Sequence, residues 1–124
     1  MSRLVLIVED SETCAETLQI ALESLPGMQT LLIRCPADAL AAMRESTNEI
    51  VAVVTDLHLP RSDGFDLIRQ LRAEPRYATL PIVLISGDSD PRLPAEALVR
   101  GADAFFSKPY SPSAVRRKLE QLLC

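Results

Sequence analysis

The chain has 124 residues, of which 48% are hydrophobic and 24% are charged, and its formal net charge is −4. This length supports one buried core, and the composition is typical of a soluble globular domain. The negative charge disfavours nucleic acid binding by this domain alone, because phosphate contacts need clustered Lys and Arg. The single basic run, residues 116–118, is interpreted as a solvated helix face.

The cysteines and the N-terminus indicate the compartment. Cys14, Cys35 and Cys124 are widely spaced and form no C-x-x-C pair, which disfavours a disulfide framework and favours a reducing environment. The apolar run at residues 4–8 is too short for a signal sequence or a membrane span. We therefore expect a cytoplasmic protein with no membrane contact.

The first two strand and helix pairs occupy residues 4–44. Residues 4–8 are apolar at every position, which is typical of a strand covered on both faces. Ser11 can cap a helix that Pro26-Gly27 ends. The expected inward stripe of this helix has three- and four-residue spacing and consists of Cys14, Leu18, Leu22 and Leu25. Residues 28–33 are a weaker strand candidate near an edge, and residues 37–44 predict a second helix.

Three further pairs follow with the same alternation. The strand candidates are residues 50–54, 82–85 and 104–106, and the helix candidates are residues 65–72, 94–100 and 111–122. Alternating strands and helices predict right-handed crossovers and a parallel sheet with helices on both faces. We expect one α/β domain over residues 1–124, since the sequence shows no repeat or linker.

Chemically active side chains follow the predicted strands. Glu9 and Asp10 follow the first strand, Asp56 the third, Ser86 the fourth and Lys108 the fifth. Ligands of open parallel sheets bind beyond the carboxyl ends of the strands. The sequence therefore predicts a site at which acids, a hydroxyl and an amine meet.

Three carboxylates in one crevice repel each other, and a hard dication such as Mg²⁺ removes that penalty. Asp56 can then act as a nucleophile toward a phosphoryl group and form an acyl phosphate. Lys108 can pair with one phosphoryl oxygen, and the Ser86 hydroxyl can donate a hydrogen bond to another. Acids after strands also serve as helix caps, so the prediction depends on the whole set.

Across nearly its whole length the chain resembles a response-regulator receiver domain, the CheY-like family of two-component signalling. The stretches that carry the resemblance are Leu-Ile-Val-Glu-Asp (6–10), Val-Val-Thr-Asp-Leu-His-Leu-Pro (53–60), Asp63-Gly64, Ile-Ser-Gly (85–87) and Gly-Ala-Asp-Ala-Phe-Phe-Ser-Lys-Pro (101–109). The resemblance implies a flavodoxin-like, doubly wound, five-stranded parallel sheet in the order 2-1-3-4-5, with five helices in three layers.

The resemblance also assigns the metal site. It implies that Asp56 is the phosphoacceptor and that Mg²⁺, with Mn²⁺ as a substitute, is bound by Asp10 and Asp56 directly. Glu9 is expected to act through water, and the backbone carbonyl of His58 is expected to be a further ligand. Glu9 stands where the family more often has Asp, which lengthens the reach to the metal.

Further roles follow from the resemblance. Ser86 and Phe105 stand where the family has its switch residues, and Lys108, before a cis proline, is the phosphate-binding lysine. His58 and Asp88 flank the position from which water attacks the phosphoryl group, so we expect them to tune its lifetime.

The resemblance implies a signalling switch and not an enzyme acting on other substrates. The expected phosphodonor is a histidine kinase or a histidine phosphotransfer protein. The output partner is unknown, and a homodimer through the fourth helix, fifth strand and fifth helix is one arrangement that the family allows. The sequence fits both a stand-alone receiver and a receiver from a longer protein.

Three other functions remain as alternatives, and the sequence fits each of them less well. A Mg²⁺-dependent phosphatase with an aspartyl nucleophile typically has a second acid two residues later, where this chain has His58. A flavodoxin-like cofactor binder needs a phosphate loop after the first strand, where this chain has Glu9 and Asp10. An interaction scaffold without chemistry is disfavoured by the complete set of acids, hydroxyl and lysine.

Overall fold

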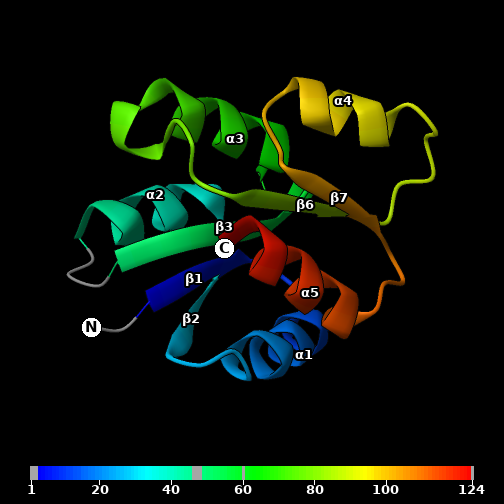
Figure 1. Ribbon diagram of the computed structural model, residues 1–124. Coiled ribbons are helices and arrows are strands. Elements are labelled where there is room, and N and C mark those ends of the chain that lie inside the picture. Colours follow the sequence, from blue (N-terminus) through cyan, green and yellow to red (C-terminus); the bar gives the residue numbers. More distant parts are fainter. Residues whose placement is uncertain (1–2, 46–48, 60, 124) are drawn as a thin grey trace.

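The computed structural model describes residues 3–45, 49–59 and 61–123. Within these ranges the chain forms a five-stranded parallel sheet in the order β2-β1-β3-β6-β7 (Figure 1). The strands are β1 (Arg3–Val8), β2 (Met28–Ile33), β3 (Glu49–Asp56), β6 (Ile82–Ser86) and β7 (Ala104–Ser107). This confirms the expected order 2-1-3-4-5, with β2 at an edge.

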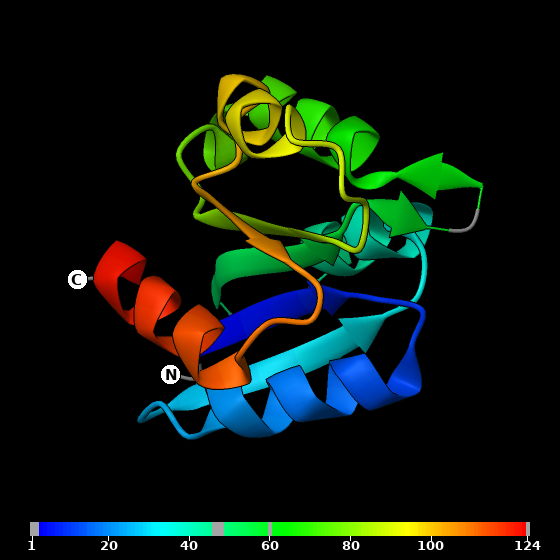
Figure 2. The same ribbon diagram turned by 90° about the vertical axis from the view of Figure 1, so that its right-hand side faces the viewer.

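Helices cover both faces of the sheet. One face carries α1 (Glu12–Glu23) and α5 (Pro112–Leu123), which lie side by side (Figure 2). The other face carries α2 (Pro36–Glu45), α3 (Gly64–Ala73) and α4 (Leu93–Val99), with a 3₁₀ turn, η1 (Pro75–Tyr77), after α3. The doubly wound, three-layer fold predicted from the sequence is therefore confirmed. Of the described helices, none is long and apolar enough to cross a membrane.

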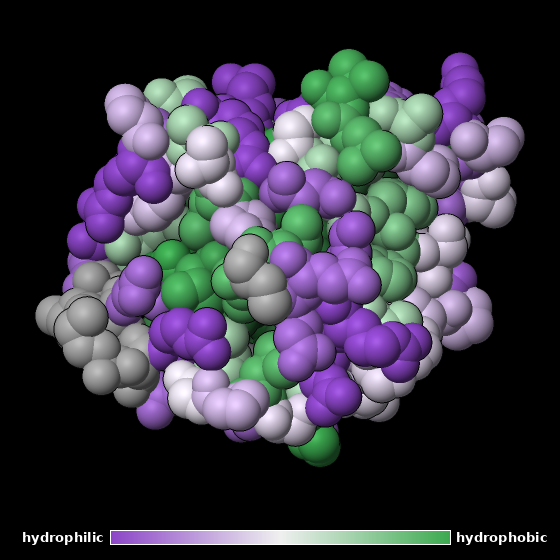
Figure 3. Space-filling view, in the orientation of Figure 1, coloured by the Kyte–Doolittle hydropathy of each residue, from purple (hydrophilic) through white to green (hydrophobic). Residues whose placement is uncertain are grey.

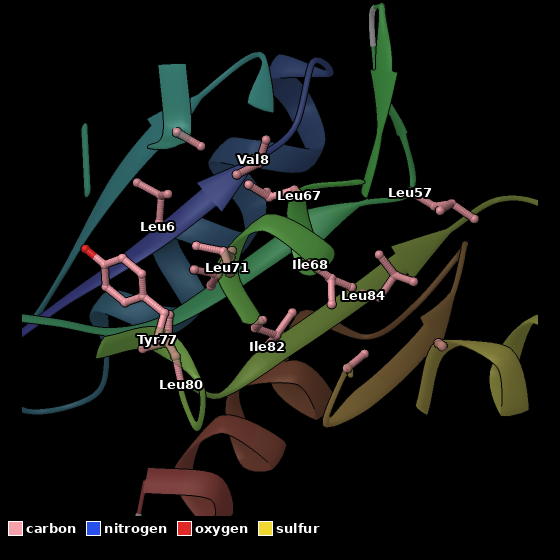
Figure 4. Close-up of a cluster of buried hydrophobic side chains, with 14 of the residues drawn as sticks. Leu6, Val8, Leu57, Leu67, Ile68, Leu71, Tyr77, Leu80, Ile82 and Leu84 are labelled. Carbon is pink, nitrogen blue, oxygen red and sulfur yellow. The ribbon is translucent and has the colours of Figure 1, made fainter. Parts of the chain in front are cut away.

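The sheet separates two hydrophobic clusters because successive strand side chains point to opposite faces. In β1, Leu6 and Val8 pack under α2 and α3, whereas Val5 and Ile7 pack against α1 and α5. Figure 4 shows the first cluster, in which side chains of α3 and η1 meet those of the strands. This two-sided burial explains why the strand sequences are apolar at almost every position.

Local signals at helix starts agree with the sequence, with one correction. Ser11 caps α1, and its hydroxyl accepts a hydrogen bond from the Cys14 backbone N–H at 3.4 Å. The buried stripe of α1 consists of Ala15, Leu18 and Leu22, and Cys14 is half-buried. The prediction that Cys14 lies on the buried stripe was therefore wrong, because the helix turns Ala15 toward the sheet. Of the cysteines, Cys124 lies outside the described residues.

The loop after β3 contains an element that the sequence did not predict. The strands β4 (His58–Leu59) and β5 (Ser62–Asp63) pair antiparallel, and the hairpin extends away from the sheet (Figure 2). Arg61 lies in this turn with a φ of 66°. The hairpin places His58 at one end of the sheet and Asp63 directly before α3.

Candidate metal-binding site

The acids of the predicted site come together because β1 and β3 are neighbouring parallel strands. Val8 pairs with Thr55, so Glu9 and Asp56, the next residues of each strand, are adjacent at the carboxyl edge. One carboxylate oxygen from each of Glu9, Asp10 and Asp56 lies within 4.8 Å of the others. Glu9 and Asp56 are buried, whereas Asp10 is exposed.

Lys108 brings a positive charge to the buried acids. Its backbone N–H donates to the Ser86 carbonyl at 2.8 Å, which extends the pairing of β6 and β7. Its ammonium donates to Asp56 Oδ2 at 2.7 Å and to Glu9 Oε1 at 2.9 Å. The Lys108-Pro109 peptide bond is cis, as expected. The lysine therefore bridges the two acids of the central strands.

Burial and mutual charge shift the pKa values of these groups. Burial and the neighbouring Asp56 raise the pKa of the Glu9 carboxyl to about 7. Burial also acts to raise the pKa of Asp56, but its interactions with neighbouring Glu9 and with the Lys108 ammonium outweigh it, so this pKa lies below its usual value. Burial acts to lower the pKa of Lys108, but the two carboxylates raise it overall. The site thus keeps Asp56 ionised, as a nucleophile must be.

The charges of the site fit a bound dication. Among the described residues, the cation in contact with Glu9 and Asp56 is Lys108. Its single positive charge compares with three clustered acids, Glu9, Asp10 and Asp56. Glu9 Oε2 is buried and has no hydrogen-bond partner in the described part of the chain, an arrangement that costs free energy unless another group satisfies it. Carboxylate oxygens are the ligands that Mg²⁺ prefers, so Glu9, Asp10 and Asp56 fit a metal site.

Three further predicted site residues lie at the same edge: Ser86 ends β6, His58 begins β4, and Asp88 lies in the loop after β6. The Ser86 side chain is buried, and its hydroxyl accepts a hydrogen bond from the Asp88 backbone N–H at 3.0 Å. His58 Nε2 lies 3.5 Å from Asp88 Oδ2, so the two residues expected to tune lifetime are in contact. The His58 backbone N–H donates to Asp56 Oδ1 at 3.4 Å, a long hydrogen bond.

Phe105 lies on the α4 side of the sheet, apart from the acids. It is half-buried, packs against the cluster beneath α3 and α4, and borders a surface cavity of about 310 Å³. Pro94 and Leu98 of α4 line the same cavity. Phe106, the next residue of β7, packs against the cluster on the opposite face of the sheet and is half-buried.

Two positions at the start of α3 have structural roles that the sequence did not reveal. Asp63 Oδ1 caps α3 by accepting a hydrogen bond from the Asp66 backbone N–H at 2.9 Å. A Cβ atom on Gly64 would lie 2.6 Å from the Asp56 carbonyl oxygen, so only glycine allows this close approach. The sequence signal for the cap and for the close approach is an acid followed by glycine directly before a predicted helix.

Known proteins are similar to this chain in sequence and in fold. Residues 5–120 match the family described as response regulator receiver domain. The transcriptional regulatory protein GltR of Pseudomonas aeruginosa is 33% identical over 98% of this chain, which spans 49% of GltR. A chemotaxis protein CheY homolog of Campylobacter jejuni is 25% identical over 96% of this chain and 91% of its own length. The solved structure of a response regulator from Chloroflexus aurantiacus is 26% identical to this chain in sequence. The structural match covers 99% of this chain and 98% of the other, with a TM-score of 0.88.

The chain is therefore a receiver-type α/β domain. It belongs to the response regulator receiver domain family of two-component signalling. It spans about half the length of some relatives that it matches and nearly all of others.

Proposed function

We propose that this domain accepts a phosphoryl group on Asp56 from a histidine kinase or a histidine phosphotransfer protein. It does so with bound Mg²⁺, or Mn²⁺ in its place, and it acts as a switch and not as an enzyme on other substrates. The observation that carries the proposal is the buried Asp56 carboxylate, which contacts Lys108 and lies beside two further acids.

The chemistry of the transfer follows from the contacts of Asp56. A carboxylate oxygen attacks phosphorus, the P–N bond of the donor phosphohistidine breaks, and the imidazole leaves with the electron pair. Oδ2 is held by Lys108 at 2.7 Å, which leaves Oδ1 as the oxygen less engaged by the protein. Lys108 then stabilises charge on the transferred phosphoryl group.

The metal would be held by Asp10 and Asp56, with Glu9 acting through water and the His58 carbonyl as a further ligand. When bound, Mg²⁺ lowers the charge barrier between the phosphoryl oxygens and the carboxylates. The chain's own part is to hold three carboxylates within one metal's reach at the ends of the paired strands β1 and β3.

The switch would begin at Ser86. Its hydroxyl now accepts the Asp88 N–H, and the phosphoryl oxygens offer it a strong new acceptor. As the hydroxyl turns toward them, the loop after β6 moves and Phe105 turns inward from its cavity. A partner or a second copy would read the changed surface of α4, β7 and α5.

The hydrophobicity of this surface supports a role in docking. Leu98 and Val99 of α4 are 56% and 86% exposed. Figure 3 shows hydrophobic side chains gathered at the top of the molecule, over α4. Exposed apolar side chains of this kind favour protein contacts.

A second surface supports docking of the phosphodonor. A cavity of about 490 Å³ adjoins Lys108 and lies between the start of α1 and the start of α5. Thr13, Cys14 and Tyr110 line it. The cavity is therefore next to the acceptor and open to a donor side chain.

The proposal is tested by labelling with acetyl phosphate and Mg²⁺. We expect the wild-type chain to gain one phosphoryl group and Asp56→Asn to gain none. Asp63→Asn is the matched control, because Asp63 is an acid of the same loop that caps α3 without facing the metal site. Robust labelling of Asp56→Asn contradicts the assignment.

A further inference from the structure

Arg72 of α3 joins three segments at the sheet edge opposite to the acids. Its Nε and Nη2 donate to the Gly101 carbonyl at 3.1 and 2.8 Å, and Nη1 donates to the Tyr77 carbonyl at 2.8 Å. Nη2 also lies 3.2 Å from Asp103 Oδ2, and this carboxylate accepts the Ile82 backbone N–H at 2.8 Å. The Arg72 side chain is only 20% exposed, so these contacts are partly shielded from water.

The segment that Arg72 holds is the C-terminal end of α4. Gly101 has a φ of 115°, and a Cβ atom there would lie 3.2 Å from Arg72 Cγ. The backbone N–H of Ala102 donates to the Ala97 carbonyl at 2.9 Å, which closes the helix. The Arg100 guanidinium lies 4.6 Å from the centre of the Phe65 ring on α3. This end of α4 is thus tied to α3 and, through Asp103, to β6.

Within the described ranges, the N-terminal end of α4 is held by packing and not by side-chain hydrogen bonds from α3. Leu93, the first residue of the helix, is buried and belongs to the hydrophobic cluster beneath α3 and α4. Arg92, its cap residue, makes no side-chain capping hydrogen bond. Within the preceding loop, the Asp90 and Arg92 backbone N–H groups donate to Asp88 and Asp90 side chains, so these bonds are local. Asp88 also contacts His58, but both side chains are largely exposed, and exposed ion pairs contribute little.

We propose that Arg72 makes the Gly101 end of α4 a fixed pivot. This inference rests on the proposed function, because it states how movement at Ser86 would reach the output surface. The loop at residues 87–92 follows Ser86 when the site is phosphorylated, and the start of α4 moves with it. Since Arg72 holds the other end, the helix tilts instead of sliding, and Leu98 and Val99 are reoriented relative to β7 and α5. The two ends of α4 thus differ in kind, because hydrogen bonds from Arg72 hold the Gly101 end and packing of Leu93 holds the start.

Hydrogen–deuterium exchange of the full chain tests the pivot. Beryllium fluoride with Mg²⁺ serves as a stable mimic of the phosphoryl group. In the wild type we expect exchange to change in residues 87–96, while the amides of Gly101 and Ala102 keep their protection. Arg72→Met keeps the apolar stem but removes the hydrogen bonds, so those two amides should exchange at least about tenfold faster. In this variant the mimic should also alter exchange at both ends of α4.

Arg69→Met is the matched control, because Arg69 lies on the same helix, is exposed, and contacts only Asp66 of α3 within the described residues. It should behave as the wild type. Labelling of Asp56 by acetyl phosphate should persist in both variants, since the ion pairs of these two arginines in the described part of the chain include none of the three acids of the metal site. If Arg72→Met does not fold, Arg72→Lys replaces it. The comparison of amide exchange at the two ends of α4 in the wild type tests the pivot in either case.

If the wild-type chain is labelled by the donor but the mimic changes amide exchange equally at both ends of α4, the pivot is contradicted and the proposed function is not. A wild-type chain that is neither labelled by the donor nor altered by the mimic would contradict the proposed function. The two failures are therefore distinguishable.

Discussion

At the scale of single residues, the charge of the site depends on Lys108. Its ammonium contacts both buried acids, at 2.7 and 2.9 Å, and is itself only partly exposed. The contact keeps Asp56 ionised in a buried position and would pass to the phosphoryl group after transfer. In the proposed reaction, one side chain would thus serve the acceptor before and after the transfer.

Replacing this lysine should slow the transfer. For Lys108→Met we expect labelling by acetyl phosphate to be about 10²-fold slower, because a positioned charge that stabilises the transition state is lost. The rate is measured by intact mass against time. Lys118→Met is the control and should label at the wild-type rate, because Lys118 is a half-buried lysine of α5 that borders the Phe105 cavity and not the cluster of acids. Unchanged labelling of Lys108→Met would show that this amine does not assist the reaction.

His58 and Asp88 lie in contact across the mouth of the site, 3.5 Å apart. We expect their side chains to restrict the approach of water to a phosphoryl group on Asp56, so His58→Ala combined with Asp88→Ala should shorten the phosphoryl lifetime several-fold. The decay of the labelled chain after removal of the donor measures this. The role in lifetime fails if the double variant decays at the wild-type rate.

At the scale of elements, the loop from β3 to α3 is fixed by a close backbone approach at Gly64. A Cβ atom there would meet the Asp56 carbonyl at 2.6 Å and Leu84 Cδ1 at 2.9 Å. Gly64→Ala should lower the free energy of unfolding by about 1–3 kcal/mol. Gly87→Ala should change it by less than about 0.5 kcal/mol, because its Cβ would meet nothing closer than 3.9 Å. Urea unfolding compares the two, and equal stabilities would contradict the close approach.

Most of the fold could be predicted from the sequence. Each central strand is apolar on both faces, and the helices that follow carry apolar residues at three- and four-residue spacing. The strands at residues 4–8 and 82–85 and the cap at Ser11 illustrate this. The β4–β5 hairpin could not be predicted, since two-residue strands carry no periodic pattern. Cys14 was misplaced because a three- or four-residue spacing fits two adjacent stripes of one helix, and Ala15 took the inner one.

The placement of the site was less fully predictable than the fold. Strand ends predicted that Glu9, Asp56 and Lys108 would meet, and their contacts agree. The unpartnered oxygen of Glu9 and the contact between His58 and Asp88 depend on side-chain geometry that no spacing encodes. The contact of Arg72 with Gly101 is of the same kind, because it joins residues 29 positions apart through a backbone carbonyl.

At the scale of the whole molecule, three acids at one edge cost stability that a dication should restore. We expect Mg²⁺ at about one hundred times its Kd to raise Tm by roughly 5–10 °C. Asp10→Asn should lose most of this rise, since Asp10 is one of the three acids and is exposed. Glu120→Gln, an exposed acid on α5, is the control and should keep it. A rise of equal size in Asp10→Asn would place the metal elsewhere.

The most direct test of the account is the location of the phosphoryl group on the intact chain. The protein is incubated with Mg²⁺ and acetyl phosphate, or with a histidine-phosphorylated protein, and its intact mass is measured before peptide mapping. We predict a gain of one phosphoryl group that disappears when the metal is chelated and that maps to the peptide containing Asp56. No gain with either donor, or a gain on another residue, would contradict the central claim.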